Sequence, residues 1–132
     1  MAEHASDDLG YPVTDVPESV ASSPDSVIRF LVGELVRHGR VHPEHAERTI
    51  RQVVNRERQG STLLGNGAAM PHSKSEVPSV IGIVGRSRTP LPWHGPDGVP
   101  VREVRLLLTP VDQPREAMRA LKQTVAGLQA KA

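Results

Sequence analysis

The stretch NRERQGSTLLGNGAAMPH, residues 55–72, is where the chain changes from helical to extended character. Before it, apolar residues recur at helical spacing, and after it they occur in short continuous runs. Within it, the Gly-Asn-Gly sequence at residues 65–67 indicates a tight turn. Residues 68–70 are then predicted to form a short strand that runs into Pro71 and His72.

Two amphipathic helices are predicted on the N-terminal side of this stretch. The first begins with Ser23 as its cap and Pro24 at its first position, and it stops at Gly39. The second starts at about Pro43 and ends near Gly60. The apolar stripes of the two helices contain Val27, Ile28, Leu31, Leu35 and Val36 in the first and Ala46, Ile50, Val53 and Val54 in the second.

Two strands and a third helix are predicted on the C-terminal side. SVIGIVG at residues 79–85 and EVRLLLT at residues 103–109 are typical of buried strands, and the Pro- and Gly-rich loop between them is typical of a turn that joins paired strands. A last amphipathic helix runs from Pro114 to about Gln129. Its apolar residues are Met118, Leu121, Val125 and Leu128. This order predicts an α/β domain, with a mixed sheet of about four to five strands flanked by helices.

Residues 1–23 are predicted to be a flexible N-terminal tail, and residues 24–132 the folded domain. The N-terminal part mixes Asp, Ser, Pro and Gly without a sustained period. A short strand within residues 11–16 is an alternative, although Pro12 and Pro17 argue against a central position in a sheet.

The composition of the 132 residues favours one domain and excludes several classes of protein. With one Trp, one Tyr and one Phe, the core must be built from Val, Leu, Ile and Ala. Sixteen basic and fifteen acidic residues give a net charge of +1 without a basic cluster, which argues against nucleic-acid binding. No segment approaches the ~20 apolar residues of a membrane span, and the acidic N-terminus is not a secretory signal. Because cysteine is absent as well, a cytoplasmic protein without disulfides is expected.

His72 is the first candidate for chemistry. Imidazole is a competent nucleophile that titrates near neutral pH. Pro71 holds Met70 extended, and the small residues before it would leave the ring accessible to a large partner. The residues alone leave open the alternative of an ordinary histidine in a surface loop.

The ordered motif around His72 resembles the phosphotransferase system (PTS) enzyme IIA family of the mannitol, fructose and nitrogen-regulatory type, the PTS EIIA type-2 domain. The similarity covers about residues 24–128. The residues that carry it are Arg56-Glu57, Ser61-Thr62, Gly65-Asn66-Gly67, Pro71-His72, Leu91-Pro92-Trp93, Pro96-Asp97-Gly98 and Leu106–Leu108.

The resemblance implies the enzyme IIA mannitol/fructose-type fold and a phosphohistidine relay without a cofactor. An HPr-like phosphocarrier would phosphorylate His72, and the phosphoryl group would pass to an enzyme IIB or be sensed by a regulatory protein. Arg56 matches the family arginine that approaches the phosphoryl group, and a guanidinium can hold two phosphate oxygens at once. Glu57 also fits the pattern and is expected to fix the end of its helix.

The sequence departs from the family pattern in the last helix. Ala117 stands where family members often carry a second histidine that assists transfer, with Arg115 and Arg119 close by in sequence. The domain is also expected to be shortened at both ends, since its N-terminal strand is hard to find. These departures leave open a non-catalytic regulatory module with weak or no phosphotransfer. A structural relative such as the cytoplasmic domains of anion exchangers is a third alternative, against which the Pro-His motif argues.

Three histidines, His38, His42 and His45, raise the alternative of a metal site. Gly39 and Pro43 fall between them, so one helix face cannot present all three. A polar turn between helices is the favoured interpretation, and we expect no bound metal.

The remaining candidates are weaker. His94 is expected to be an exposed loop residue and Trp93 a packing residue. Ser73 and Ser75 lack the context of a nucleophile elbow, and residues 65–67 are not followed by a Walker lysine. The oligomeric state stays open, and an exposed sheet edge or apolar face would favour a homodimer.

Overall fold

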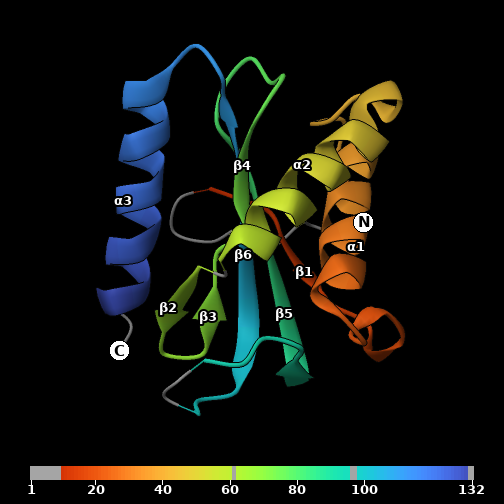
Figure 1. Cartoon of the computed structure of the whole chain (residues 1–132), viewed down its shortest axis with the longest axis vertical. Helices are drawn as coiled ribbons and strands as arrows, with labels where there is room; N and C mark the ends of the chain where they lie inside the picture. The colour runs from red at the N-terminus through yellow and green to blue at the C-terminus, as the bar shows by residue number, and fades with distance from the viewer. Residues whose placement is uncertain (1–9, 61, 96–97, 131–132) are drawn as a thin grey trace.

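A computed structural model describes residues 10–60, 62–95 and 98–130, and six strands within them form one mixed sheet. The strand order is β1-β5-β6-β3-β2, and β4 also pairs with β6 (Figure 1). The strands are β1 (Val13–Asp15), β2 (Leu63–Gly65), β3 (Ala68–Ala69), β4 (His72–Ser75), β5 (Ile81–Leu91) and β6 (Val101–Pro110). The sheet exceeds the predicted number of strands because β2 and β4 form at residues for which no strand was predicted.

Helices cover both faces of this sheet (Figure 1). The two helices α1 (Pro24–Arg37) and α2 (Ala46–Gln59) lie on one face, and α3 (Pro114–Ala130) lies on the other. Short 3-10 helices, η1 (Glu18–Val20) and η2 (Pro43–His45), precede α1 and α2. The predicted mixed sheet flanked by helices is therefore confirmed.

The ends of α1 are those predicted from the sequence. The Ser23 hydroxyl oxygen accepts a hydrogen bond from the Ser26 backbone N–H at 3.1 Å, and Pro24 is the first helical residue. After the helix, Gly39 adopts the left-handed conformation (φ +71°) that favours glycine at this position.

The start of α2 differs from the prediction by one short turn. Residues 43–45 form η2, and His42 caps this turn because its Nδ1 accepts the Glu44 N–H at 3.2 Å. The α-helix itself begins at Ala46 and ends at the predicted Gly60.

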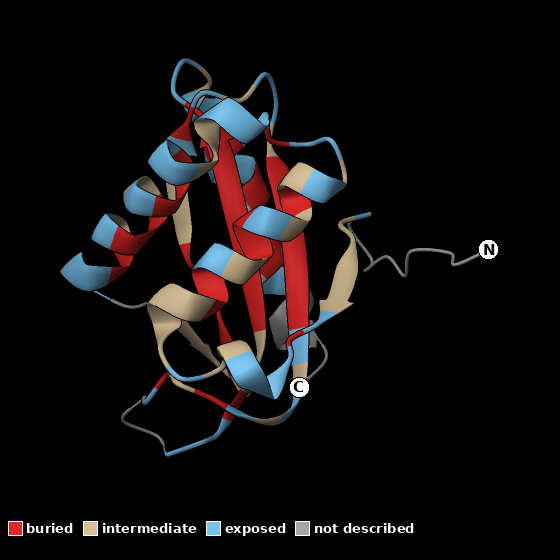
Figure 2. Ribbon diagram, turned by 90° about the vertical axis from the view of Figure 1, so that its right-hand side faces the viewer, coloured by how far each residue is buried: buried red, intermediate tan, exposed pale blue. Residues whose placement is uncertain are grey.

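The main core lies between the sheet and the helices α1 and α2. In Figure 2 the central strands are buried along much of their length, and the helices are buried on the side that faces them. Alternate residues of β6 point into this core, as expected for a strand. The core residues from α1 and β6 include Val27, Ile28, Leu31, Val32, Leu35, Val104, Leu106 and Leu108.

The face of α3 that packs on the sheet is different from the predicted one. Met118 was predicted to lie in the apolar stripe, but its side chain is 52% exposed. The buried residues of α3 are Ala117, Ala120 and Thr124. Small side chains allow the helix to approach β6 closely, so this contact does not need the large apolar residues that periodicity detects. The side chain of Leu128 lies outside the described residues.

The two long strands β5 and β6 pair antiparallel, with Ile81 opposite Leu108. This confirms the predicted pairing, but β5 continues to Leu91 through residues that were predicted to be loop. The register shifts between Arg86 and Leu91. Proline has no backbone N–H to donate to a neighbouring strand. Pro90 is tolerated here because the regular hydrogen-bonded pairing of the two strands is interrupted at this point.

The prediction of a flexible tail over residues 1–23 is wrong for residues 11–23. Val13–Asp15 pair parallel with β5, and Val16 is buried and donates its N–H to the Arg86 carbonyl at 2.8 Å. β1 is the edge strand of the sheet, where flanking prolines are tolerated. Only three residues form it, too few for a period to show in the sequence. Residues 1–9 lie outside the described residues.

Candidate functional site

The Gly-Asn-Gly turn sets the backbone path that leads to His72. Gly65, Asn66 and Gly67 have φ values of +74°, +54° and +78°, which confirms the predicted tight turn. At Gly67 a Cβ atom would lie 2.8 Å from the Pro100 carbonyl oxygen. The Gly67 carbonyl also accepts N–H bonds from Arg102 (2.9 Å) and Glu103 (3.2 Å). The turn is thus fastened directly to the start of β6.

His72 lies where the chain passes from β3 to β4 along the same neighbour, β6. β3 and β4 both run parallel to β6, with His72 opposite Leu107. The connecting residues Met70 and Pro71 are buried. Hydrogen bonds from the Met70 N–H to the Thr62 carbonyl (2.8 Å) and from the Leu107 N–H to the Pro71 carbonyl (3.0 Å) hold them. His72 therefore follows the short strand β3, close to the predicted position, but it is itself the first residue of β4, a strand that was not predicted.

The half-buried imidazole of His72 is oriented by the backbone. Its Nδ1 lies 2.9 Å from the Met70 carbonyl oxygen. A carbonyl oxygen can only accept, so the proton of the neutral ring resides on Nδ1 and Nε2 keeps its lone pair. This partner could not be predicted from the sequence, because the position of a backbone carbonyl depends on the conformation of the chain rather than on residue type.

Arg56 lies in the last turn of α2, which packs against β4. Its Nη1 donates to the Gly60 carbonyl oxygen at 3.0 Å. The helix that carries Arg56 and the strand that begins with His72 are therefore in contact. The guanidinium of Arg56, however, is bonded to the Gly60 carbonyl at the end of its own helix. The role of Arg56 at a phosphoryl group stays a prediction.

Glu57 and Trp93 form a buried pair that the sequence did not predict. The Trp93 Nε1–H donates to the Glu57 Oε2 at 2.8 Å, and the residues are 3% and 8% exposed. The bond joins the end of α2 to the chain between β5 and β6. Trp93 was predicted to be a packing residue, and its burial confirms this. No sequence pattern links residues this far apart, so the pairing had no detectable signal.

Several other predicted residues have structural surroundings or partners of their own. Ala117 is buried in α3, while the exposed Arg119 lies 3.7 Å from Glu116. The rings of His42 and His45 are 5.7 Å apart. Among the described residues, no group of three or more His, Cys, Asp or Glu side chains is arranged to hold a metal ion. In the same part of the chain, no helix combines the length and apolar character needed to span a membrane.

Residues 15–131 match the protein family described as phosphoenolpyruvate-dependent sugar phosphotransferase system, EIIA 2. The chain belongs to this EIIA 2 family. The match begins within β1, which agrees with the strand seen there and not with a tail up to residue 23. The resemblance inferred from the Pro-His motif is therefore confirmed.

The EIIA 2 chain has relatives named nitrogen regulatory protein. It is 35% identical to that of Escherichia coli K12 over 71 residues, which are 52% of this chain and 44% of the relative. It is 38% identical to that of Pseudomonas aeruginosa over 88 residues, which are 65% of this chain and 57% of the relative. The chain thus spans about half the length of these relatives.

Solved structures share the fold of this EIIA 2 chain. The nitrogen regulatory protein IIA-Ntr from Neisseria meningitidis superposes with a TM-score of 0.72 at 27% identity, covering 86% of this chain and 75% of the other. Enzyme IIA mannitol from Escherichia coli gives a TM-score of 0.57 at 22% identity, covering 78% and 73%. The predicted enzyme IIA fold is confirmed.

Proposed function

We propose that this chain is a phosphoryl carrier of the phosphoenolpyruvate-dependent phosphotransferase system and that Nε2 of His72 accepts the phosphoryl group. The observation that carries the proposal is the 2.9 Å contact between His72 Nδ1 and the Met70 carbonyl oxygen. It assigns the proton to Nδ1 and leaves Nε2 as the nucleophile. Membership of the EIIA 2 family supports the role of phosphoryl carrier.

The transfer itself needs little covalent chemistry from the protein. The Nε2 lone pair attacks phosphorus in line with the bond to the nitrogen of a phosphohistidine donor. The new P–Nε2 bond forms as the old P–N bond breaks, and its electron pair returns to the donor imidazole. The Nδ1 proton of His72 stays in place, where the Met70 carbonyl stabilises the positive charge that develops on the ring.

Arg56 is proposed to meet the phosphoryl oxygens after a change of rotamer. Its hydrogen bond to the Gly60 carbonyl is exposed, so water can replace this partner at little cost when the side chain turns away. A phosphoryl group brings roughly two negative charges, which attract a guanidinium more strongly than a carbonyl does. The packing of α2 against β4 would keep the required movement short.

The partners are proposed by analogy. An HPr-like phosphocarrier would be the donor, in the cytoplasm. The mannitol enzyme IIA of Escherichia coli has been solved in complex with phosphorylated enzyme IIB, which makes an enzyme IIB one candidate acceptor here. A regulatory target is the second candidate. Ala117 favours it, because this residue lacks the imidazole that assists onward transfer in other family members.

The acceptance of phosphate is tested by incubating the chain with phosphoenolpyruvate, enzyme I and HPr. We expect an acid-labile, base-stable phosphate on the wild type and none on the His72→Ala variant. His94→Ala is the matched control, because His94 is an exposed histidine in the loop between β5 and β6. Absence of label on the wild type, or equal labelling of His72→Ala, would contradict the proposal.

The same assay tests Arg56 and separates the two proposed acceptors. Arg56→Ala is expected to label more slowly, whereas Arg37→Ala, an exposed arginine at the end of α1, should label at the wild-type rate. Passage of phosphate to an enzyme IIB would support the carrier role. A labelled protein that passes phosphate to no enzyme IIB would support the regulatory role.

A further inference from the structure

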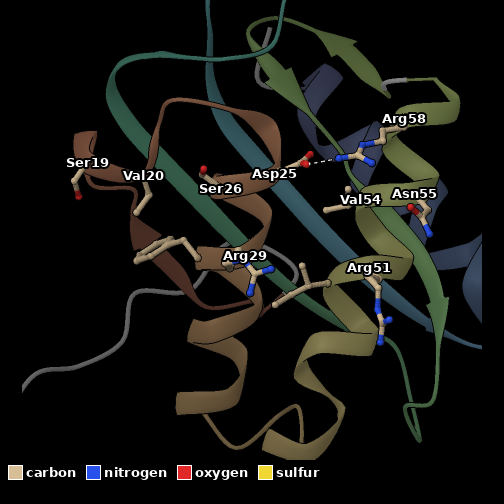
Figure 3. Close-up of a pocket in the computed structure, with 11 residues that line it drawn as sticks. Ser19, Val20, Asp25, Ser26, Arg29, Arg51, Val54, Asn55 and Arg58 are labelled. Carbon is tan, nitrogen blue, oxygen red and sulfur yellow. Dashed lines mark hydrogen bonds and ion pairs between the residues drawn. The ribbon is translucent and has the colours of Figure 1, made fainter.

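An open groove of about 650 Å³ lies on the outer side of α1 and α2, away from the sheet (Figure 3). Residues from η1, α1 and α2 line it. Its floor is apolar and includes Val20, Phe30, Ile50 and Val54. Val20 and Phe30 are only partly buried although they pack against the core, and Phe30 is the one phenylalanine of the chain. Val20 and Phe30 therefore leave apolar area uncovered within the described residues, whereas Ile50 and Val54 are buried.

The rim of the groove is basic. Its charged lining residues are three arginines, Arg29, Arg51 and Arg58, and one aspartate, Asp25. Two ion pairs bridge α1 and α2: Arg29 with Glu47 and Arg58 with Asp25, both at 2.7 Å. Figure 3 shows the second of these pairs.

Arg51 is the exposed rim arginine for which the described residues show no hydrogen bond or salt bridge. Its charge does act on Glu47, four residues earlier in α2, which is already paired with Arg29. A groove with an apolar floor and an excess of arginines is complementary to an apolar stripe flanked by carboxylates.

We propose that this groove binds an acidic amphipathic helix of a partner protein. The backbone groups of α1 and α2 are bonded within their own helices, so the groove can offer an occupant only side chains. The backbone N–H and C=O groups of an occupant must therefore form hydrogen bonds within the occupant. A helix meets this condition, whereas an added strand does not. Apolar residues one turn apart on such a helix would cover the floor, and its Asp and Glu residues would meet the arginine rim.

Neither His72 nor Arg56 lines the groove. Arg56 and Arg58 are two residues apart, so they project about 200° apart around the helix axis. Arg58 lines the groove and reaches Asp25 across it. Binding in the groove should therefore be measurable without phosphorylation, and its test is independent of the proposed function.

The test uses the full chain and two fluorescein-labelled helical peptides. Both carry leucines at positions i, i+3, i+4 and i+7, with Glu at the other positions in one peptide and Lys in the other. Fluorescence anisotropy at low ionic strength should show the Glu peptide binding at least about tenfold more tightly than the Lys peptide. Arg51→Glu should weaken binding of the Glu peptide about tenfold or more. Arg40→Glu, an exposed charge reversal outside the groove, and His72→Ala should leave binding unchanged.

Several results would overturn the proposal. Equal affinity for both peptides, or an unchanged affinity after Arg51→Glu, would exclude the groove as a site for acidic helices. Loss of binding in His72→Ala would assign the peptide to the other site. If a chain lacking residues 1–9 bound the peptide much more tightly, the acidic N-terminal segment would be the occupant. A dimer in sedimentation that Arg51→Glu dissociates would make a second copy the occupant.

Discussion

The indole N–H of Trp93 donates a 2.8 Å hydrogen bond to the carboxylate of Glu57, and both residues are buried. Glu57 follows Arg56 in the last turn of α2. The bond fastens this turn to the chain between the two long strands. Arg56, which is predicted to approach the phosphoryl group, is thus next in sequence to a residue that Trp93 holds in place.

We predict that Trp93→Phe destabilises the fold while the apolar ring contact is kept. The variant leaves the buried Glu57 carboxylate without the indole donor, which costs about 1–3 kcal/mol. Urea unfolding of the variant and the wild type measures this decrease in the free energy of unfolding. Glu57→Gln keeps an acceptor oxygen for the indole and should lose less. Equal stability of Trp93→Phe and the wild type would show that the bond contributes nothing.

Glu103 is predicted to make stability depend on pH in the acid range. Burial raises the pKa of this carboxyl group, but the hydrogen bonds and charges of Arg105 and Arg86 outweigh it, so the pKa lies below its ordinary value. A lowered folded-state pKa stabilises the fold above the unfolded pKa of about 4.3. This stabilisation is lost as the pH falls through the lowered value.

The Glu103→Gln variant tests this dependence by unfolding at several pH values. Its free energy of unfolding should be about 2 kcal/mol lower than that of the wild type at neutral pH, and this difference in stability should shrink as the solution becomes acidic. Glu47→Gln removes an exposed partner of Arg29 and should change stability little at any pH. A constant difference between Glu103→Gln and the wild type from neutral to strongly acidic pH would contradict the assignment.

The two glycines of the tight turn are predicted to differ in their tolerance of alanine. Both have φ near +75°, which costs an alanine roughly 1 kcal/mol or more. Only at Gly67 would the added Cβ meet a backbone oxygen, that of Pro100 at 2.8 Å. Gly67→Ala should therefore lower the free energy of unfolding at least about twice as much as Gly65→Ala. A similar decrease in the free energy of unfolding for both variants would mean that the turn can move away from β6 without destabilising the fold.

The cap of α1 is predicted to stabilise the fold through one hydroxyl group. Ser23→Ala removes the acceptor of the Ser26 N–H and should cost about 1 kcal/mol in thermal or urea unfolding. The neighbouring Ser22→Ala is exposed and outside the helix, so it serves as the control. A loss in Ser22→Ala as large as that in Ser23→Ala would argue against a specific cap.

Local signals in the sequence predicted much of this fold correctly. The cap at Ser23, the stop at Gly39 and the Gly-Asn-Gly turn each depend on a few neighbouring residues with strong conformational preferences. The paired strands β5 and β6 were found from their continuous apolar runs. The ordered Pro-His motif then identified the family.

Features that depend on tertiary contact were predicted only as alternatives or not at all. The sequence offered β1 only as an alternative, because it is three residues long and becomes a strand only where β5 provides a partner. The packing face of α3 uses Ala117, Ala120 and Thr124, which carry little hydrophobic signal, while Met118 points to solvent. The Met70 carbonyl beside His72 and the Glu57–Trp93 bond arise from the path of the folded chain.

The acceptor atom is tested most directly by an NMR measurement of the imidazole nitrogens of His72 after phosphoryl transfer from HPr. We predict that the phosphorus is bonded to Nε2 and that Nδ1 still carries its proton, held by the Met70 carbonyl. A phosphoryl group on Nδ1 of His72, or on another residue of the chain, would contradict it.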